Sequence, residues 1–169
     1  MPLYNPENAE VFVYTFKDGL LSAAAHDLKL RVARFRIDVD DEGKTVAGSF
    51  DAGSLAVLCA RRDGVDAPHV LPRSFFAEIE RNIERDVLAT RKFPEVRFAS
   101  TSVTGDAVVG ALTLHGVVRS VRVERSGDEA TWVGRVQLDQ REFGIQPFRA
   151  MLGTLKVRPE VDVEVRLRR

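Results

Sequence analysis

Residues 93–116 read FPEVRFASTSVTGDAVVGALTLHG, and this stretch predicts a β-hairpin. Side chains alternate between the two faces of a strand, so Val96 and Phe98 share one face of the first strand. Val108 and Leu112 share one face of the second strand in the same way. The turn sequence TGD separates the two alternating runs. We therefore expect an antiparallel strand pair with one apolar face.

The same alternation recurs along most of the chain and is typical of a protein built from strands. Near the end of the sequence, odd-numbered positions from 161 to 167 are apolar and the even-numbered ones are charged. This pattern indicates a strand with one buried and one solvent-facing side. We expect eight strands, at residues 10–17, 28–39, 45–58, 95–103, 107–114, 117–125, 131–138 and 155–168.

Some segments break this alternation. Apolar residues recur at every fourth position within residues 74–89, which predicts a helix with Ser74 as its N-cap. We expect this helix to cover one end of the fold, because its apolar stripe must be buried. A shorter helical turn is predicted at residues 20–26. Residues 141–153 mix large apolar side chains with Gly and Pro, so we expect them to fold back over the core.

These elements predict an all-β fold with one inserted helix. Mainly antiparallel strands of this number form either a sandwich or an up-and-down barrel. Short links after the fourth strand favour an eight-stranded antiparallel, lipocalin-like β-barrel, since sequence neighbours then lie side by side. With 169 residues and 44% apolar content, we expect one domain over residues 1–169. Such a barrel is wide enough to be filled by its own side chains or to hold one small apolar ligand.

Charge and hydropathy limit the classes of partner. Basic and acidic residues number 25 each, so no overall field favours nucleic acid or an anionic membrane surface. We expect no nucleic-acid partner, and we expect most arginines to lie in solvated cross-strand ion pairs. No apolar run is long enough to span a bilayer, and the first residues do not resemble a signal peptide. We therefore expect a cytoplasmic protein.

Few side chains are candidates for chemistry. Cys59 is the single cysteine, so no intrachain disulfide can form, and we expect it to be structural. The histidines His26, His69 and His115 do not have metal-ligand spacing, so we expect no metal and no other cofactor. His26, beside Asp27, could bind the backbone, contact a polar head group or act as a general base. We expect His115 to stabilise a turn.

Four short motifs, in their order and spacing, carry a family resemblance. They are His26-Asp27-Leu28, FP-x-V-x-F-x-S-T at 93–101, G-x-L-T-L-H-G at 110–116 and Phe143-Gly144-Ile145. Together they resemble the YceI-like family, whose members are lipocalin-like polyisoprenoid-binding proteins. The resemblance implies a barrel closed at one end, whose interior holds an isoprenoid chain such as a polyprenyl phosphate or a quinone tail. Many members carry a secretion signal, which we do not expect here.

The chain departs from the family pattern at two places. Many members have a His shortly before the FP motif, whereas this chain reads RDVL at residues 85–88. Many have an Arg before Ser-Asp-Phe-Gly, whereas here Gln140 precedes Arg141. A shift of one position on a strand moves a side chain to the opposite face, so an anchoring Arg is not carried over.

Three functions follow from these observations. The first is non-enzymatic carriage or sequestration of an isoprenoid, quinone or fatty-acid-like lipid. The second is an enzyme that uses His26 and Asp27 on an apolar substrate, which lacks a supporting nucleophile or metal in the sequence. The third is an interaction protein with a self-filled barrel, with a homodimer as one form. Besides His26, the candidate ligand contacts are aromatic residues that could line a cavity or fill a core: Phe12, Tyr14, Phe35, Phe50, Phe98, Phe143 and Phe148.

Overall fold

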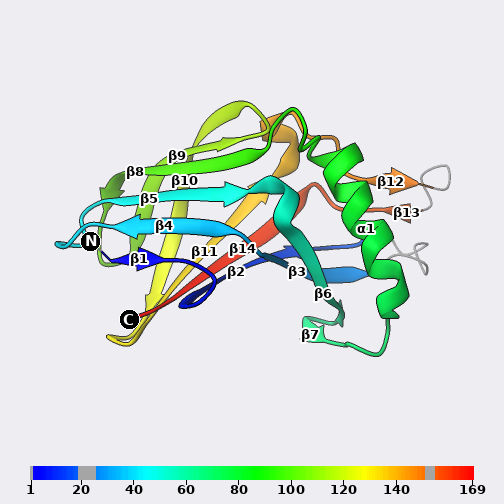
Figure 1. Cartoon of the computed structure of the whole chain (residues 1–169), viewed down its shortest axis with the longest axis horizontal. Helices are drawn as coiled ribbons and strands as arrows, with labels where there is room; N and C mark the ends of the chain where they lie inside the picture. The colour runs from blue at the N-terminus through cyan, green and yellow to red at the C-terminus, as the bar shows by residue number, and fades with distance from the viewer. Residues whose placement is uncertain (1, 19–25, 151–154) are drawn as a thin grey trace.

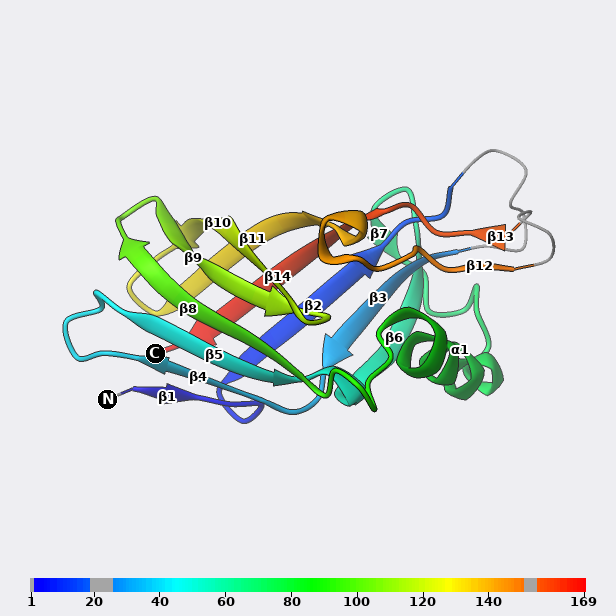
Figure 2. The same ribbon diagram turned by 90° about the horizontal axis from the view of Figure 1, so that it is seen from above.

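The computed structural model describes residues 2–18, 26–150 and 155–169. Its main element is a 12-stranded antiparallel sheet that curves strongly around its inner face (Figures 1 and 2). The order of strands across this sheet is β1-β4-β5-β8-β9-β10-β11-β14-β2-β3-β6-β7. Two further strands, β12 and β13, pair only with each other. The prediction of a mostly β fold with an inserted helix is confirmed.

Fourteen strands and five 3-10, α- or π-helical segments make up the described structure. The strands are β1 (Leu3–Tyr4), β2 (Ala9–Thr15), β3 (Asp27–Val32), β4 (Phe35–Val39), β5 (Val46–Asp51), β6 (Leu55–Arg62), β7 (Val65–Asp66), β8 (Glu95–Val103), β9 (Ala107–Leu114), β10 (Val117–Gly127), β11 (Thr131–Asp139), β12 (Arg149–Ala150), β13 (Leu155–Lys156) and β14 (Glu160–Arg168). The helical segments are the 3-10 turns η1 (Ala52–Ser54) and η4 (Gln140–Phe143), and a continuous run of η2 (Arg73–Phe75), α1 (Phe76–Asn82) and the π-helical η3 (Ile83–Val87).

The hairpin at residues 93–116 is confirmed as the pair β8 and β9, in which Phe98 lies opposite Leu112. Its two family motifs meet at the ends of these strands. The Phe93 ring lies 4.4 Å from the His115 ring, between centroids. Gly116 has a φ of +75°, and a Cβ there would lie 2.7 Å from Phe93 Cε1. Glycine is therefore required at this position both by its backbone conformation and by the close approach of the ring.

Three of the predicted strands are divided in the structure. Residues 28–39 form β3 and β4, residues 45–58 form β5, η1 and part of β6, and residues 155–168 form β13 and β14. The break before η1 has a local cause, because the Asp51 side chain accepts a hydrogen bond from the Gly53 N–H at 2.9 Å. Such a side-chain contact competes with the sheet ladder and starts a turn.

Closure of the sheet differs from the prediction. The strand order begins at β1 and ends at β7, so these pairings do not form a closed ring, and the eight-stranded barrel is not confirmed. The physical reason is the division of the longest strands. β3 lies between β2 and β6, whereas its continuation β4 lies between β1 and β5.

The predicted helix is present, with a different start. Helical structure runs from Arg73 through Val87, but the Ser74 side chain does not cap it, because Pro72 is the residue that precedes the first turn. The predicted turn at residues 20–26 lies outside the described residues except for His26. In the segment after β11, Phe143 is 1% exposed, so the prediction that this segment folds back over the core is confirmed for its described part.

Two apolar clusters form the core. The first lies near the chain termini and unites Tyr4 of β1 with Ile37 of β4 and Leu167 of β14. The second gathers Phe143 and Ile145 with residues of the central strands. The inner face of the sheet extends between these clusters, and it is the surface on which a site could form.

Candidate ligand cavity

The inner face of the sheet encloses a cavity of about 960 Å³. Strand alternation decides which side chains reach it. On β14, Val161, Val163 and Val165 line the cavity, whereas Glu164 lies on the outer face. Neighbouring strands continue the same wall, since Val136 of β11 lies opposite Val163 in the ladder and also lines the cavity.

The interior side chains do not fill this space. Val121, Val136 and Val163 all point inward, yet each is only half-buried. Among the described residues, Phe143 and Leu30 are the largest side chains with less than 2% of their surface exposed. A packed barrel core would bury its inward-facing residues almost completely. The partial exposure of these valines therefore reflects an open volume beside them.

One end of the cavity is closed by packed side chains, and we call this end the floor. Ile37 and Leu167 of the first core cluster line it and are each 3% exposed. Trp132 lies beside them, with the Arg125 guanidinium carbon 3.7 Å from the centroid of its ring. Arg125 Nη1 also donates a hydrogen bond to the Thr104 carbonyl at 2.8 Å. Burial, and the nearby Arg169 charge, lower the pKa of Arg125.

The opposite end, which we call the mouth, is covered by helical turns and by the β12–β13 ribbon. Figure 2 shows α1 and this ribbon at the end of the sheet away from the termini. Ile79 and Asn82 of α1 line the cavity there, as do Ala150 and Leu155 of the ribbon. None of the residues in the helical run 73–87, all of it within the described chain, is buried. This cover is therefore loosely packed.

Few polar groups reach the cavity wall, and some of them already have partners. The Gln140 amide donates to the Arg158 carbonyl at 3.2 Å. Asp51 accepts from the Arg34 side chain at 2.8 Å as well as from Gly53. The remaining wall is dominated by aliphatic residues. Such a wall binds a ligand by removing apolar surface from water, at about 0.8 kcal/mol for each buried methylene.

The structure places the predicted aromatic contacts in three different environments. Phe50, Phe98 and Phe148 line the cavity, and so does His26. Phe35 is 9% exposed and belongs to the first core cluster, and Phe143 belongs to the second. Neither of these two residues lines the cavity. A role in ligand binding stays a prediction for the four residues that do line it.

Phe12 and Tyr14 lie on the outer face of β2, away from the cavity. Their neighbours Val11, Val13 and Thr15 take the inward positions. Cations cover the two outer rings, with Lys29 Nζ 4.6 Å from the Phe12 centroid and Arg61 Cζ 4.7 Å from the Tyr14 centroid. Sequence pattern could not separate the two faces of this strand, because both are apolar from residue 11 to residue 14. Burial beneath this cover raises the pKa of Tyr14.

The adjacent residues His26 and Asp27 point in different directions. His26 lines the cavity, whereas Asp27 does not and accepts a hydrogen bond from the Lys17 backbone N–H at 2.8 Å. Cys59 is 7% exposed, and burial raises the pKa of its thiol. His115 has a φ of +53° at the turn after β9. In residues 2–18, 26–150 and 155–169, no group of three or more His, Cys, Asp or Glu side chains could hold a metal ion.

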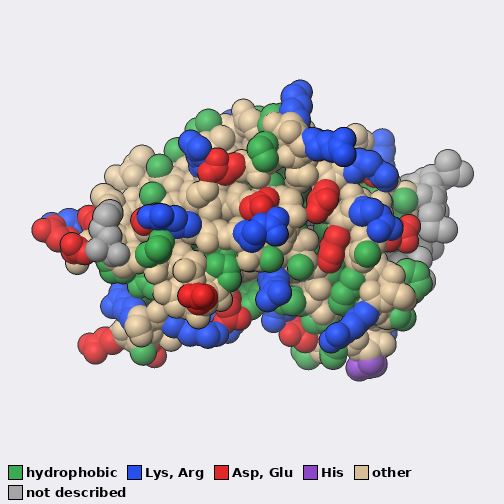
Figure 3. Space-filling view, viewed as in Figure 1, with side chains coloured by type: hydrophobic (Ala, Val, Ile, Leu, Met, Phe, Trp, Pro, Cys, Tyr) green, Lys and Arg blue, Asp and Glu red, His purple; other side chains and the backbone are tan. Residues whose placement is uncertain are grey.

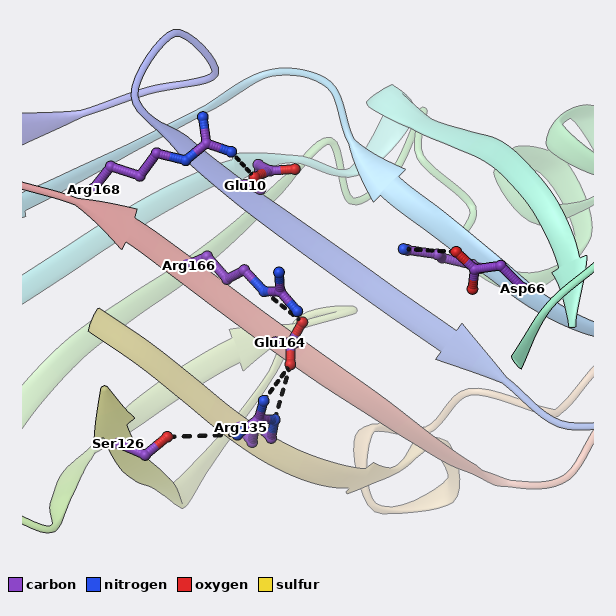
Figure 4. Close-up of polar contacts among 8 residues, drawn as sticks. Glu10, Asp66, Ser126, Arg135, Glu164, Arg166 and Arg168 are labelled. Atoms are coloured by element: carbon purple, nitrogen blue, oxygen red, sulfur yellow. Dashed lines mark hydrogen bonds and ion pairs between the residues drawn. The ribbon is translucent and has the colours of Figure 1, made fainter. Parts of the chain in front are cut away.

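Ion pairs on the outer face agree with the charge pattern of the sequence. The Glu164 carboxylate is bound by Arg135 at 2.8 Å and by Arg166 at 3.0 Å, and Arg168 pairs with Glu10 (Figure 4). Figure 3 shows acidic and basic side chains interspersed on the face it displays. Arg135 and Glu164 pair across the neighbouring strands β11 and β14, as predicted. Most arginine ion pairs of the described residues instead join side chains one or two positions apart, as Arg36 and Asp38 do, so the prediction that most would be cross-strand is wrong.

The aliphatic wall and the helix residues Ile79 and Ile83 were not among the predicted ligand contacts, although they line the cavity. A signal for them was present in the sequence. The inward positions of each strand and the apolar stripe of residues 74–89 are both visible as periodicity. Periodicity finds buried faces, but it does not show whether a buried face meets other side chains or a cavity.

Comparisons with known proteins bear on the fold and the family. The crystal structure of BcnA from Burkholderia cenocepacia superimposes with a TM-score of 0.61 at 15% identity, covering 94% of this chain and 94% of that chain. A polyisoprenoid binding domain from Saccharophagus degradans, implicated in plant cell wall breakdown, has a TM-score of 0.59 at 11% identity and covers 94% of this chain and 91% of that chain. At these identities the likeness concerns the fold.

No curated protein sequence matches the chain. None of the helices in the described part of the chain has the length and hydrophobicity needed to cross a membrane. The sequence itself matches the YceI-like domain over residues 31–168, and the chain therefore belongs to the YceI-like family.

Proposed function

We propose that this protein binds one apolar, chain-like molecule inside the curved sheet and carries or sequesters it without chemical change. An isoprenoid, a quinone tail and a fatty acid all fit this description. The observation that carries the proposal is the hollow interior with its aliphatic wall. Its volume of about 960 Å³ is near the upper end of the range of roughly 300–1,000 Å³ for small-molecule sites.

The energetics of such a wall favour long apolar ligands over small polar ones. Burying ten methylenes would contribute about 8 kcal/mol before ordering costs are subtracted. Membership of the YceI-like family supports this class of ligand, and so does the fold shared with a protein described as a polyisoprenoid binding domain.

We also propose that the sheet works as one barrel-like domain over residues 1–169. β3 runs into β4 through residues 33–34, and β5 runs into β6 through η1. Each of these pairs would then act as one bent strand. In this arrangement the eight predicted strands would surround the cavity. The bent strand β3–β4 would pair with β2 on one side and with the bent strand β5–β6 on the other, and β5–β6 would pair in turn with β8.

Uptake of a fluorescent fatty acid and of a polyprenol tests the proposal. Val136 and Val163 lie opposite each other on β11 and β14 and both line the cavity. The double variant V136F/V163F adds two rings to the cavity and should weaken probe binding by at least about tenfold. Organic extraction of the purified wild-type protein, followed by mass spectrometry, identifies any lipid that was bound during expression.

Val118 offers a matched control, because it is 61% exposed on β10 and does not line the cavity. The variant V118F makes the same chemical change outside and should bind the probe as the wild type does. An empty extract together with no uptake of either probe would count decisively against the proposal. Equal binding by the wild type and the folded double variant would also contradict it.

A further inference from the structure

The β12–β13 ribbon at the mouth has two unlike faces. Ala150 and Leu155 pair across it and line the apolar cavity. Arg149 and Lys156 pair across it one position away, and both are exposed. Alternation therefore places the two cations on the face turned away from the cavity. Figures 1 and 2 show the ribbon extending past the sheet beside α1.

Arg149 and Lys156 lie directly opposite each other in this ribbon, and their repulsion disfavours the pairing. Like charges directly across an antiparallel pair destabilise it. Two further cations lie on the chain next to the ribbon. Arg158 lies two residues after the end of β13, and the backbone of Lys17 pairs with that of Val157 in an isolated antiparallel β-bridge. Four basic residues thus lie at this edge of the mouth. Lys17 is opposite Val157, which lines the cavity, so alternation leaves Arg149, Lys156 and Arg158 as the outward-facing cations.

Carboxylates do not neutralise this group in the described structure. Within residues 2–18, 26–150 and 155–169, no ion pair joins Lys17, Arg149, Lys156 or Arg158 to an acidic side chain. Asp18 meets the group through its backbone N–H, which donates to the Lys156 carbonyl at 2.9 Å. Asp27 also lies beside the group, because its carboxylate accepts a hydrogen bond from the Lys17 backbone N–H at 2.8 Å. Counting Asp18 and Asp27 as acids, four positive and two negative charges leave a local excess of two.

On the outer face of the main sheet, by contrast, arginines pair with carboxylates. Arg135 and Arg166 share Glu164, and Arg36 binds Asp38 at 2.8 Å. The whole chain has no net charge, so the excess at the mouth is a local asymmetry. It is placed beside the loosely packed cover of an apolar cavity, where a lipid would enter or leave.

We propose that the basic face formed by Arg149, Lys156 and Arg158 docks the mouth of the cavity onto an anionic membrane surface. The choice of a lipid surface over another polyanion rests on the proposed lipid-binding function, because the same ribbon presents its reverse side to the cavity. Basic residues near an anionic leaflet contribute about 1 kcal/mol each, and salt screens this attraction.

Sedimentation with lipid vesicles tests the docking. The wild type should bind phosphatidylcholine vesicles that contain phosphatidylserine, should not bind pure phosphatidylcholine vesicles, and should be released by added salt. The variant R149Q/K156Q should bind the anionic vesicles about 30-fold more weakly, since two cations are lost. The charge-preserving variant R149K/K156R should bind as the wild type does.

The control variant R97Q/R122Q removes two positive charges away from the ribbon, where Arg97 pairs with Glu95 on β8 and Arg122 pairs with Glu124 on β10. It should leave vesicle binding unchanged. Absence of wild-type binding to anionic vesicles would overturn the proposal, as would an equal loss in R149Q/K156Q and R97Q/R122Q. Binding to a short DNA duplex without binding to vesicles would overturn it too.

A vesicle-free titration with the fluorescent fatty acid separates this proposal from the proposed function. R149Q/K156Q should take up the probe as the wild type does, because neither side chain lines the cavity. Normal probe uptake without vesicle binding defeats the docking alone. Failure of the wild type to take up any apolar probe defeats the lipid-binding function, on which the choice of a membrane rests.

Discussion

At the floor of the cavity, Ile37 and Leu167 are each 3% exposed, whereas at the mouth Phe75 is 50% exposed and Ile79 is half-buried. Both ends line the same cavity, but only the floor has the packing of a protein core. Stability grows with buried apolar contact, and local opening is easiest where such contact is sparse. We therefore expect the floor to contribute most of the stability of the fold, and the mouth to open locally and admit the ligand.

The largest expected effect is a difference in stability between equivalent substitutions at the two ends of the cavity. Ile37→Ala at the floor should lower the free energy of unfolding by about 3 kcal/mol, because it leaves a void among packed side chains. Ile79→Ala in α1 should lower it by about 1 kcal/mol or less, because that side chain is only half-buried. Urea unfolding followed by circular dichroism measures both. Equal losses of unfolding free energy in the two variants would contradict the difference in packing between floor and mouth.

A smaller effect is expected in the wall between the two ends. A Cβ on Gly110 of β9 would lie 2.4 Å from the Ala99 carbonyl oxygen and 2.6 Å from Phe98 Cζ. Gly110→Ala should therefore cost about 2 kcal/mol through strain in the β8–β9 pair. Gly105→Ala in the turn of the same hairpin is the control, since nothing lies within 4 Å of its Cβ. If Gly110→Ala left the free energy of unfolding unchanged, the β8–β9 pair could accommodate the added Cβ without strain, which would contradict this prediction.

Much of this wall could be predicted from sequence. The alternation in residues 93–116 predicted the β8–β9 hairpin, and His115, expected at a turn, lies at the turn after β9. The alternation from Val161 to Leu167 identified the inward side of β14. These predictions succeeded because pairing and turn chemistry are local, and the sequence carries both.

The site could be predicted only in part, for physical reasons. On β2, Phe12 and Val13 are equally apolar, and the cations that cover Phe12 come from other strands. At the break after Val32, the Arg34 backbone N–H donates to Ser54 Oγ at 3.0 Å, a contact between segments distant in sequence. The volume of a cavity depends on how far apart the walls are held, which no periodicity encodes.

The smallest expected effect is the pH dependence of stability that Asp66 in β7 contributes. Partial burial raises the pKa of Asp66 in β7, but hydrogen bonds from Lys29 at 3.2 Å and Arg61 at 3.0 Å outweigh it and hold that pKa below its ordinary value. A carboxyl with a lowered pKa stabilises the fold above its unfolded-state pKa of about 3.9, and this contribution is lost as the pH falls through the lower folded-state pKa.

Asp66→Asn should therefore be slightly less stable than the wild type at neutral pH, and the difference should shrink in strong acid. Urea midpoints at several pH values measure it. The effect should stay small, because the Asp66 side chain is 46% exposed and solvent screens its ion pairs. A difference that grew as the pH fell would contradict the assignment of these hydrogen bonds to the charged carboxylate.

A crystal structure of the protein with a terminally brominated fatty acid tests most directly whether the hollow interior is the binding site. The anomalous signal of bromine locates the end of the chain without ambiguity. We expect the signal between the wall valines Val136 and Val163 and the floor at Trp132, with the acyl chain leading toward α1. Bromine on the outer face, or a collapsed interior in a complex of proven stoichiometry, would contradict the account.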